Sequence, residues 1–435
     1  MESYNLEICS LNPTTSTKMN DVDAPEAKSE GVQCKHFVKR KHRFCKMTVK
    51  RGFQYCGEHL PNDPQSECAE DSKTLRIICP LDNKHTCFAH KLQKHLKICN
   101  AQPNTNLPYI SKGVNCGQVD PDSTLTLQNT RQLSSVQPGA IKDLVQKITK
   151  IYDEAIDGKI LTNVQKHEIL EVELKKPEFG DRTKKHLIQA SSIVGILRQK
   201  DLIKDETCYI EFGAGKGQLS YWIAQAVADT KSSSVLLVER ASHRHKFDNK
   251  LDKSEGRVHR VKADIGDLML NKVEAAEKCA GVVGLTKHLC GDATDLTLRC
   301  LQTYESNGGK VFGVIMAFCC HHRCQWTAYT GKDFFAKHGL TRDEFDIMCG
   351  MVSWAVCGSG LSRESNKDSK EIPVNERDKE IGLSREEKEE VGRRCKNILD
   401  YGRMHFMESL GFGCEMFYYV DASVSPENVC IVAVK

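Results

Sequence analysis

The residues best suited to hold a small ligand form one glycine-rich turn. Gly213, Gly215 and Gly217 alternate with other residues, and the acid Glu211 comes two positions earlier. The apolar run 208–212 before the turn predicts a strand, and residues 219–227 after it predict a helix. Backbone N–H groups and a helix N-terminus would then meet at the carboxyl end of a strand, where a polar ligand can bind. The glycines would allow a sharp turn and a close approach to that ligand.

This E-x-G-x-G-x-G order resembles motif I of the S-adenosylmethionine (SAM) methyltransferases. The resemblance implies that Glu211 faces the cationic methionine end of SAM. It also implies that Glu239, after the second strand-like run, binds the ribose hydroxyls, and that Asp264 and Ile265, after the third, lie near the adenine. A nicotinamide enzyme would also place an acid after its second strand. The glycine spacing and the early acid argue against that class, because a dinucleotide site uses G-x-G-x-x-G.

Polar residues that could handle a proton follow the fourth and fifth strand-like runs, 281–285 and 311–317. We nominate Lys287, His288, Asp295 and His321 as the catalytic candidates. Methyl transfer from a sulfonium is an in-line displacement, so the protein mainly positions the nucleophile and helps to remove its proton. Structural hydrogen bonds at the rim of the cleft remain the alternative role for each of the four.

Five of the six residues from Cys319 to Cys324 are Cys or His. They could bind a metal, but adjacent residues cannot all reach one ion, so a polar loop facing the substrate is favoured. A Ser384–Glu387 capping box predicts a helix to about Leu410. Its arginines, Arg394 and Arg403 among them, are expected on a solvated face in preference to a contact with phosphate.

Two Cys/His sets near the N-terminus have the spacing of structural zinc sites. The first is a Cys3His set and the second a Cys2His2 set, so each offers four ligands and no open position. The sets are Cys34, Cys45, Cys56 and His59, and Cys79, His85, His95 and Cys99. Cys87 and His90 are spare potential ligands near the second set. A Cys-rich core without metal is the alternative, but so few apolar residues could hardly stabilise it.

Composition narrows the class of protein. The 435 residues contain 21 cysteines, and residues 34–60 carry eight Lys or Arg against one acid, Glu58. This basic segment is a plausible phosphate-binding surface. The chain shows neither a signal-peptide core nor a run of about 20 apolar residues, so we expect no membrane association. We expect a reducing intracellular compartment, nuclear or cytoplasmic, in which clustered cysteines indicate metal.

Strand-like runs alternate with helical stretches from residue 184 onward, which predicts a parallel sheet in an α/β fold. The expected fold class is a Rossmann-like methyltransferase domain with a mostly parallel seven-stranded sheet, preceded by two zinc modules. The amphipathic helix near 141–156 is expected to bury one face in its own domain rather than to form a coiled coil. The expected segments are a disordered tail (1–31), a CCCH module (32–62), a CHHC module (75–100), a linker (101–137), a helical connector (138–180) and the methyltransferase domain (181–435) with a charged insertion near 360–380.

Taken together, the motifs resemble those of the eukaryotic tRNA 2′-O-methyltransferases that modify nucleotide 4 of the acceptor stem. The resemblance rests on both zinc sets, on residues 287–296 (KHLCG-x-ATDL) and on residues 319–326 (CCHHRC-x-W), with support from 185–189 and 425–429. It implies SAM and two structural zinc ions as cofactors and the tRNA acceptor stem as substrate. No obligate protein partner is evident. The alternatives are a SAM-dependent protein methyltransferase and a zinc-finger RNA-binding adaptor with an inactive methyltransferase domain.

Overall fold

A computed structural model of the chain describes residues 32–38, 43–49, 53–56, 59, 76–99, 102, 107–117, 133–243, 246–251, 256–357 and 376–435. The chain divides into two compact units, Met1–Pro103 and Asn104–Lys435, and each is treated by itself. The predicted tail (1–31) and most of the predicted insertion near 360–380 lie outside the described residues.

The N-terminal unit contains two small antiparallel hairpins. Strands β1 (Phe37–Val38) and β2 (Arg43–Phe44) form the first, and β3 (Arg76–Cys79) and β4 (Asp82–Phe88) form the second. The 3-10 turn η3 (Ala89–Lys91) then leads into the short helix α1 (Leu92–Ile98).

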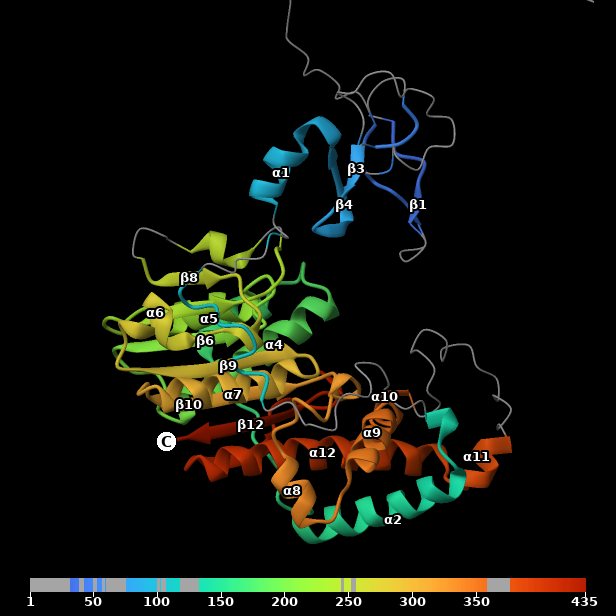
Figure 1. The fold of residues 1–435 in the computed structure, drawn as a ribbon. Coiled ribbons are helices and arrows are strands. Elements are labelled where there is room, and N and C mark those ends of the chain that lie inside the picture. Colours follow the sequence, from blue (N-terminus) through green and yellow to red (C-terminus); the bar gives the residue numbers. More distant parts are fainter. Residues whose placement is uncertain are drawn as a thin grey trace, which may run out of the picture. The chain divides into compact units, whose positions relative to one another are not determined.

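The second unit is built on an eight-stranded, mostly parallel sheet (Figure 1). Its spatial order is β5-β11-β12-β10-β9-β6-β7-β8. The run from β10 to β8 is parallel, whereas β12 is antiparallel to both β10 and β11. The strands are β5 (Leu161–Thr162), β6 (Thr207–Phe212), β7 (Ser234–Val238), β8 (Val258–Val261), β9 (Gly281–Leu289), β10 (Val311–Phe318), β11 (Gly413–Tyr418) and β12 (Val429–Val434).

Alternating side chains send the two faces of this sheet into two separate cores. Tyr209 of β6 belongs to one core, together with apolar residues of α4 and α5, and the next residue, Ile210, belongs to the other. The second core includes residues of α2, α7, α9 and α12. Both faces are therefore covered, as expected for a parallel sheet.

Twelve α-helices and several 3-10 turns are assigned among the described residues, and eleven of the helices belong to the second unit. Those of the second unit are α2 (Pro138–Ala155), α3 (Glu171–Leu174), α4 (Asp181–Gln199), α5 (Gln218–Ala226), α6 (Glu274–Glu277), α7 (Ala293–Ser306), α8 (Lys332–Lys337), α9 (Arg342–Met351), α10 (Trp354–Cys357), α11 (Glu376–Ile381) and α12 (Arg385–Ser409), with the 3-10 turns η5 (Leu133–Ser135), η6 (Glu168–Leu170), η7 (Phe247–Lys250), η8 (Ile265–Asp267), η9 (Leu270–Lys272) and η10 (His321–Arg323).

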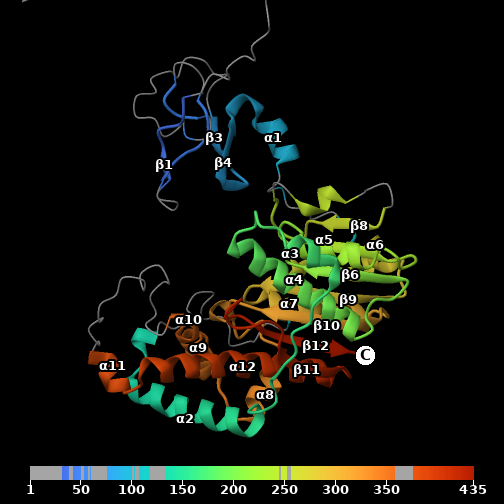
Figure 2. The same ribbon diagram turned by 180° about the vertical axis from the view of Figure 1, so that it is seen from behind.

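The longest helix, α12, packs lengthwise against α2 (Figure 2). Helix α2 buries Ile141, Leu144, Ile148 and Ile151 on one face, which confirms the predicted amphipathic helix. The capping box at the start of α12 is also present, with Ser384 and Glu387 bonding each other's backbone N–H groups.

Residues 107–117, placed in a linker by the sequence prediction, belong to the second unit and pack against η8 and the residues beside it. Asn115 is 1 % exposed, and its side-chain amide donates to the carbonyl oxygens of Ile265 and Leu268 at 2.7 and 2.8 Å. Ile110 also pairs with Leu268 in an isolated bridge. This part of the predicted linker therefore supports η8, the turn that follows β8.

The predicted strands are all present, and β9 is longer than expected. It continues through Thr286, Lys287 and His288 to Leu289, so two of the catalytic candidates lie within the strand and not after it. The described parts of the chain contain no helix long and apolar enough to cross a membrane.

Candidate functional site

A cleft of about 660 Å³ opens at the carboxyl ends of β6, β7, β8 and β9. One part of its wall comes from the loops after β6, β7 and β8, and includes Gly213, Glu239, Asp264 and Ile265. The other part comes from the ends of β9 and β10 and from the start of α7, and includes His288, Leu289, Cys290, Asp292, His322 and Arg323. The structure thus brings four of the seven predicted cofactor residues to one cleft with one predicted catalytic residue.

The glycine turn has the left-handed backbone that its residue types allow. Gly213, Gly215 and Gly217 have φ angles of 68°, 52° and 77°. A Cβ atom on Gly213 would lie 2.5 Å from a methyl carbon of Leu289, and one on Gly217 would lie 2.7 Å from Leu237. Gly217 precedes α5 directly. A larger residue at Gly213 or Gly217 would therefore both strain the backbone and collide with the core.

Glu239 fixes the turn from the neighbouring strand. Its carboxylate accepts from the backbone N–H of Gly215 at 2.9 Å and from that of Ala241 at 2.7 Å. Asp264 accepts from the N–H of Gly266 at 3.0 Å and so caps η8. Both acids thus lie on the cleft wall with orientations set by backbone groups, which pre-organises them for a polar ligand.

Glu211 is buried near the end of β6. Its carboxylate is 4 % exposed and accepts from the N–H of Ser220 at 2.8 Å and from the Ser220 hydroxyl. It is absent from the described residues that line the cleft. Burial raises its pKa to about 7, although the hydrogen bonds from Ser220 oppose the shift. Glu211 therefore holds the first turn of α5, and its predicted contact with the ligand stays a prediction.

His288 is an extra residue in β9. Lys287 pairs with Ala317 of β10 and Leu289 pairs with the next residue, Phe318, which leaves His288 without a partner in the register. Its φ angle is 62°, which is rare for a residue with a side chain. Such bulges occur next to active sites, where they re-aim a side chain.

Lys287 and His288 both contact α4. Lys287 Nζ donates to the carbonyl oxygen of His186 at 3.1 Å, and His288 Nε2 donates to Oε1 of Gln189 at 3.0 Å. Burial lowers the pKa of Lys287 to about 8, against the opposing charge of Glu211. Burial and the charge of Lys287 lower the pKa of His288 to about 4, so its ring is neutral near pH 7 and Nδ1 is left as an acceptor.

Asp295 and His321, the other two catalytic candidates, belong to a buried network away from this cleft. Asp295 accepts from Arg403 at 2.7 and 3.1 Å and from the N–H and hydroxyl of Thr330. His321 Nε2 lies 2.8 Å from the carboxylate of Asp400, which also accepts from Arg403 at 2.8 Å. All four network side chains (Asp295, His321, Asp400 and Arg403) are at least 96 % buried, so the network joins α7, η10 and α12.

The expected solvated face is wrong for Arg403, and Arg394 is only partly exposed. Arg403 is 1 % exposed, so it lies neither on a solvated face nor over the cleft. Arg394 bonds Glu390 on its own helix and Asp153 on α2, both with N–O distances near 3 Å. These arginines therefore hold α12 to its neighbours.

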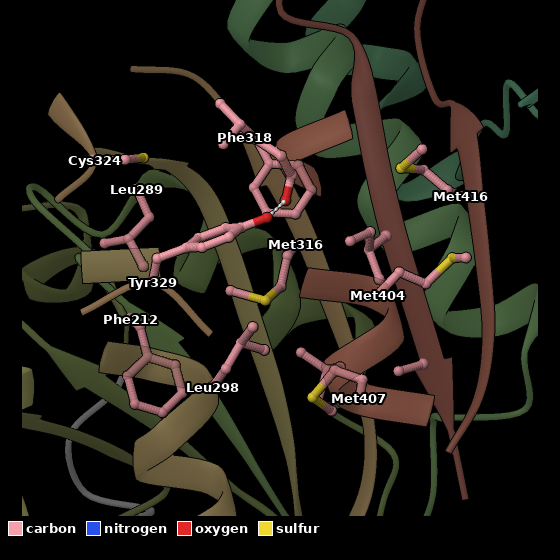
Figure 3. Close-up of a cluster of buried hydrophobic side chains, with 14 of the residues drawn as sticks. Phe212, Leu289, Leu298, Met316, Phe318, Cys324, Tyr329, Met404, Met407 and Met416 are labelled. Atoms are coloured by element: carbon pink, nitrogen blue, oxygen red, sulfur yellow. Dashed lines mark hydrogen bonds between the residues drawn. The ribbon is translucent and has the colours of Figure 1, made fainter. Parts of the chain in front are cut away.

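One apolar cluster contains both Leu289, at the end of β9, and methionines of α12 (Figure 3). Leu289, which lines the cleft, belongs to the same cluster as Phe318 and as Met404 and Met407 of α12. The hydroxyl of Tyr329 donates to the carbonyl oxygen of Leu399 at 2.9 Å. The floor of the cleft is thus part of the core that α12 covers.

Sequence reasoning missed several residues of the site. His186 and Gln189 lie in a segment that the family resemblance singled out, but nothing in its pattern assigned them a role. Asp292 lines the cleft, and burial raises its pKa to about 6, although the hydrogen bond from Gln325 opposes the shift. A polar residue between the end of a strand and the start of the next helix is the signal that could have identified Asp292.

In the N-terminal unit, each predicted zinc set converges on one point. In the first, Cys45 and Cys56 have sulfurs 4.0 Å apart, and His59 Nδ1 lies 3.3 Å from Cys56 and 3.5 Å from Cys34. In the second, the Cys79 and Cys99 sulfurs are 3.7 Å apart, and the Nε2 atoms of His85 and His95 are 3.2 Å apart. Ligand atoms about 2.0–2.3 Å from one tetrahedral ion have such separations. Among the described residues, Cys87 and His90 belong to neither set.

The cleft fits SAM in shape and chemistry. Its volume lies in the range of small-molecule sites. Exposed glycine backbone at one end and two oriented carboxylates along one wall are suited to a ligand with a cationic end and a hydroxylated ribose. SAM bound there would supply an electrophilic methyl group.

Comparison with known families gives three matches along the chain. Residues 188–434 match the family described as methyltransferase TRM13. Residues 32–60 match the CCCH zinc finger in TRM13 protein, and residues 76–100 match the U11-48K-like CHHC zinc finger. The methyltransferase match alone covers more than half of the chain.

Similar proteins align over nearly their full length. The tRNA:m(4)X modification enzyme TRM13 homolog of Mus musculus is 34% identical over 477 residues, covering 95% of this chain and 98% of the mouse protein. The human protein of the same name is also 34% identical, and the alignment covers 96% and 97% of the two chains. The tRNA:m(4)X modification enzyme TRM13 of Schizosaccharomyces pombe is 30% identical over 374 residues, covering 83% and 95%. The chain is a SAM-dependent methyltransferase with two zinc fingers and belongs to the TRM13 methyltransferase family.

Proposed function

We propose that this protein methylates the ribose 2′-hydroxyl of nucleotide 4 in the acceptor stem of certain tRNAs. The observation that carries the proposal is the cleft in which Gly213, Glu239 and Asp264 face His288. Support for the substrate comes from relatives named as tRNA:m(4)X modification enzymes. The proposal includes the domain division from the sequence, with zinc modules at 32–62 and 75–100 and a methyltransferase domain at 181–435.

We assign a Rossmann-like fold to the methyltransferase domain. The order β8-β7-β6-β9-β10 corresponds to the 3-2-1-4-5 order of doubly wound sheets, in which ligands bind outside the carboxyl ends of the strands. The seven-stranded sheet of this proposal would comprise β6 to β12, with the two-residue β5 as an added edge. In this scheme Gly213, Gly215 and Gly217 line or shape the methionine end, Glu239 receives the ribose hydroxyls, and Asp264 and Ile265 border the adenine.

His288 and Lys287 are our candidates for the proton of the 2′-hydroxyl. His288 lines the cleft and is neutral near pH 7, so it can accept a hydrogen bond from a hydroxyl through Nδ1. Lys287, with its lowered pKa, is the stronger base of the pair and lies next to it. Asp295 and His321 act as positioning residues, because their side chains are used in the buried network.

The zinc modules are assigned to RNA binding. Cys34, Cys45, Cys56 and His59 would hold one zinc ion, and Cys79, His85, His95 and Cys99 the other. The basic residues of the first module would contact phosphates, and an acceptor stem presents phosphates and 2′-hydroxyls along its wide minor groove. Binding should therefore weaken as salt increases.

The test is transfer of labelled methyl from SAM to unmodified tRNA, followed by nuclease digestion and mapping. The expected product is one 2′-O-methylated nucleoside at position 4. Label in a methylated base would refute ribose methylation, and label only in protein would favour the protein methyltransferase. Absence of transfer by a protein that binds both tRNA and SAM would favour the adaptor.

A further inference from the structure

Three cysteines meet beside the cleft, and neither the family matches nor the proposed function gives them a role. Cys290 follows β9, and Cys319 and Cys320 follow β10, the adjacent parallel strand. The sulfur of Cys290 lies 3.3 Å from that of Cys319 and 3.2 Å from that of Cys320. All three sulfurs lie within 4.8 Å of one another. The cluster therefore combines two sulfurs from the segment after β10 with one sulfur from the segment after β9.

These separations indicate a shared ion. They are longer than a disulfide bond, which is about 2.05 Å. Thiolates about 2.3 Å from one zinc ion lie roughly 3.7–4.0 Å apart, so a shift of about half an ångström would be enough. The two N-terminal sets provide an internal reference, with sulfur–sulfur distances of 3.7 and 4.0 Å. The three sulfurs are too close to enclose a cluster of several iron atoms, so a single ion fits them best.

The two loops that carry the thiols are tied to each other. The backbone N–H of Gln325 donates to Oδ1 of Asp292 at 2.6 Å. A Cβ atom on Gly291 would lie 2.7 Å from the carbonyl oxygen of Arg323, so the two backbones touch at this glycine. Close contact between the loops fixes the thiols in place, as a pre-organised ligand set requires.

The coordination of such an ion would be incomplete. Among the described residues, no fourth Cys, His, Asp or Glu ligand atom joins this group. The three thiols are all partly exposed, and Cys290 lines the same cleft as Glu239 and His288. Three protein ligands with one open position are typical of catalytic zinc, whereas structural zinc has four.

We propose that Cys290, Cys319 and Cys320 form a third metal site, which takes Zn²⁺ and leaves one coordination position open toward the cleft. Thiolate ligands favour zinc or another thiophilic ion over magnesium or calcium. Water or an oxygen of the bound substrate can occupy the open position. The site depends only on these residues and their geometry, and it stands whether or not tRNA is the substrate.

Metal analysis of the full-length protein, purified under reducing conditions, tests the proposal. We expect about three zinc ions per chain in the wild type and about two in a C319S/C320S variant, by one ion per converging set. The matched control is C414S, which alters a partly exposed cysteine of β11 and should keep three. Two ions in the wild type, or an unchanged metal content in C319S/C320S, would overturn the site.

A second measurement needs only the wild type, so it decides the question even if the variant does not fold. Alkylation of Cys290, Cys319 and Cys320 is followed by peptide mass spectrometry with and without a zinc chelator, and the exposed Cys116 serves as the reference. A bound ion should protect the three thiols, and the chelator should speed their alkylation at least tenfold while Cys116 stays unchanged. Equal rates in both conditions, or a disulfide among the three, would refute metal binding.

Discussion

Arg403 on α12 forms a buried, two-pronged ion pair with Asp295 on α7, which lies 108 residues earlier in the chain. The same guanidinium also bonds Asp400. Replacing Arg403 with Met would leave two buried carboxylates without their cation. We expect R403M to lower the free energy of unfolding by about 3–5 kcal/mol, measured by denaturant titration. R393M, on an exposed arginine of the same helix, should cost less than about 1 kcal/mol. Equal stability of the two variants would contradict the role of the network.

Glu239 should control SAM affinity. The E239A variant removes the acceptor for two backbone N–H groups of the cleft wall and the carboxylate assigned to the ribose. We expect E239A to bind SAM about 10–100-fold more weakly, because hydrogen bonds to a charged group are lost. Calorimetry with SAM measures this affinity. E415A, which alters an exposed acid on β11, is the control and should bind SAM normally. Normal affinity in E239A would show that the cofactor lies elsewhere.

The pH dependence of methyl transfer should report Lys287. A base acts in its neutral form, so the single-turnover rate should rise with pH and level off above the Lys287 pKa of about 8. K287R keeps the charge and should lose this inflection, whereas K185R, on an exposed lysine of α4, should keep it. His288, with its pKa of about 4, should add no inflection above pH 5. An inflection near pH 6.5 that disappears in H288Q would contradict this assignment.

Glu211 should make the fold less stable as pH rises. Its pKa is raised from 4.5 to about 7 in the folded protein, so its favourable contribution is complete below about pH 4.5 and is lost as pH approaches 7. E211Q cannot ionise, so its stability relative to the wild type should increase between pH 5 and pH 7.5. Thermal unfolding of both proteins across this pH range measures the difference. E274Q, at an exposed acid of α6, should show no such increase. A constant difference between E211Q and the wild type would argue against a buried, raised-pKa carboxyl.

Removing one N-terminal zinc should weaken RNA binding and leave SAM binding intact. We expect C45S to lose about one zinc ion per chain. Its tRNA affinity should fall and depend less on salt, because fewer phosphates are contacted. C87S, on a buried cysteine outside both ligand sets, should keep its zinc. Unchanged tRNA affinity in C45S would separate the zinc module from substrate binding.

The sequence was sufficient for features that depend on local pattern. Apolar runs located β6, the first part of β9 and most of β10, and the capping box located the start of α12. The strand β11 was missed, because Glu415 interrupts its apolar run and the strand lies near the sheet edge beside the short β5. Edge strands carry a weaker pattern, since only part of their surface is buried.

Features that depend on distant partners could not be predicted. Arg403 occupies a helix rich in charge, and only its pairing with Asp295 explains why it is buried. Glu211 was assigned to the ligand because of its place before the glycines, and nothing in that spacing predicted that its carboxylate accepts from Ser220 in the next helix. Spacing along the chain predicted which loops meet, and it could not predict which side chains turn toward the ligand.

The bulge at His288 changes the phase of β9. In a regular strand, consecutive residues point to opposite faces, so Leu289 would share the face of Leu285. Instead, Leu285 lies in the core beside α4 and α5, and Leu289 lies in the opposite core. The extra residue lets Lys287 and His288, although adjacent, both reach α4. Deleting His288 would restore the alternation and leave Leu289 on its present face, but it would remove the extra side chain that the bulge brings to the cleft. The length of this strand, as much as its composition, therefore determines which residues can reach the ligand.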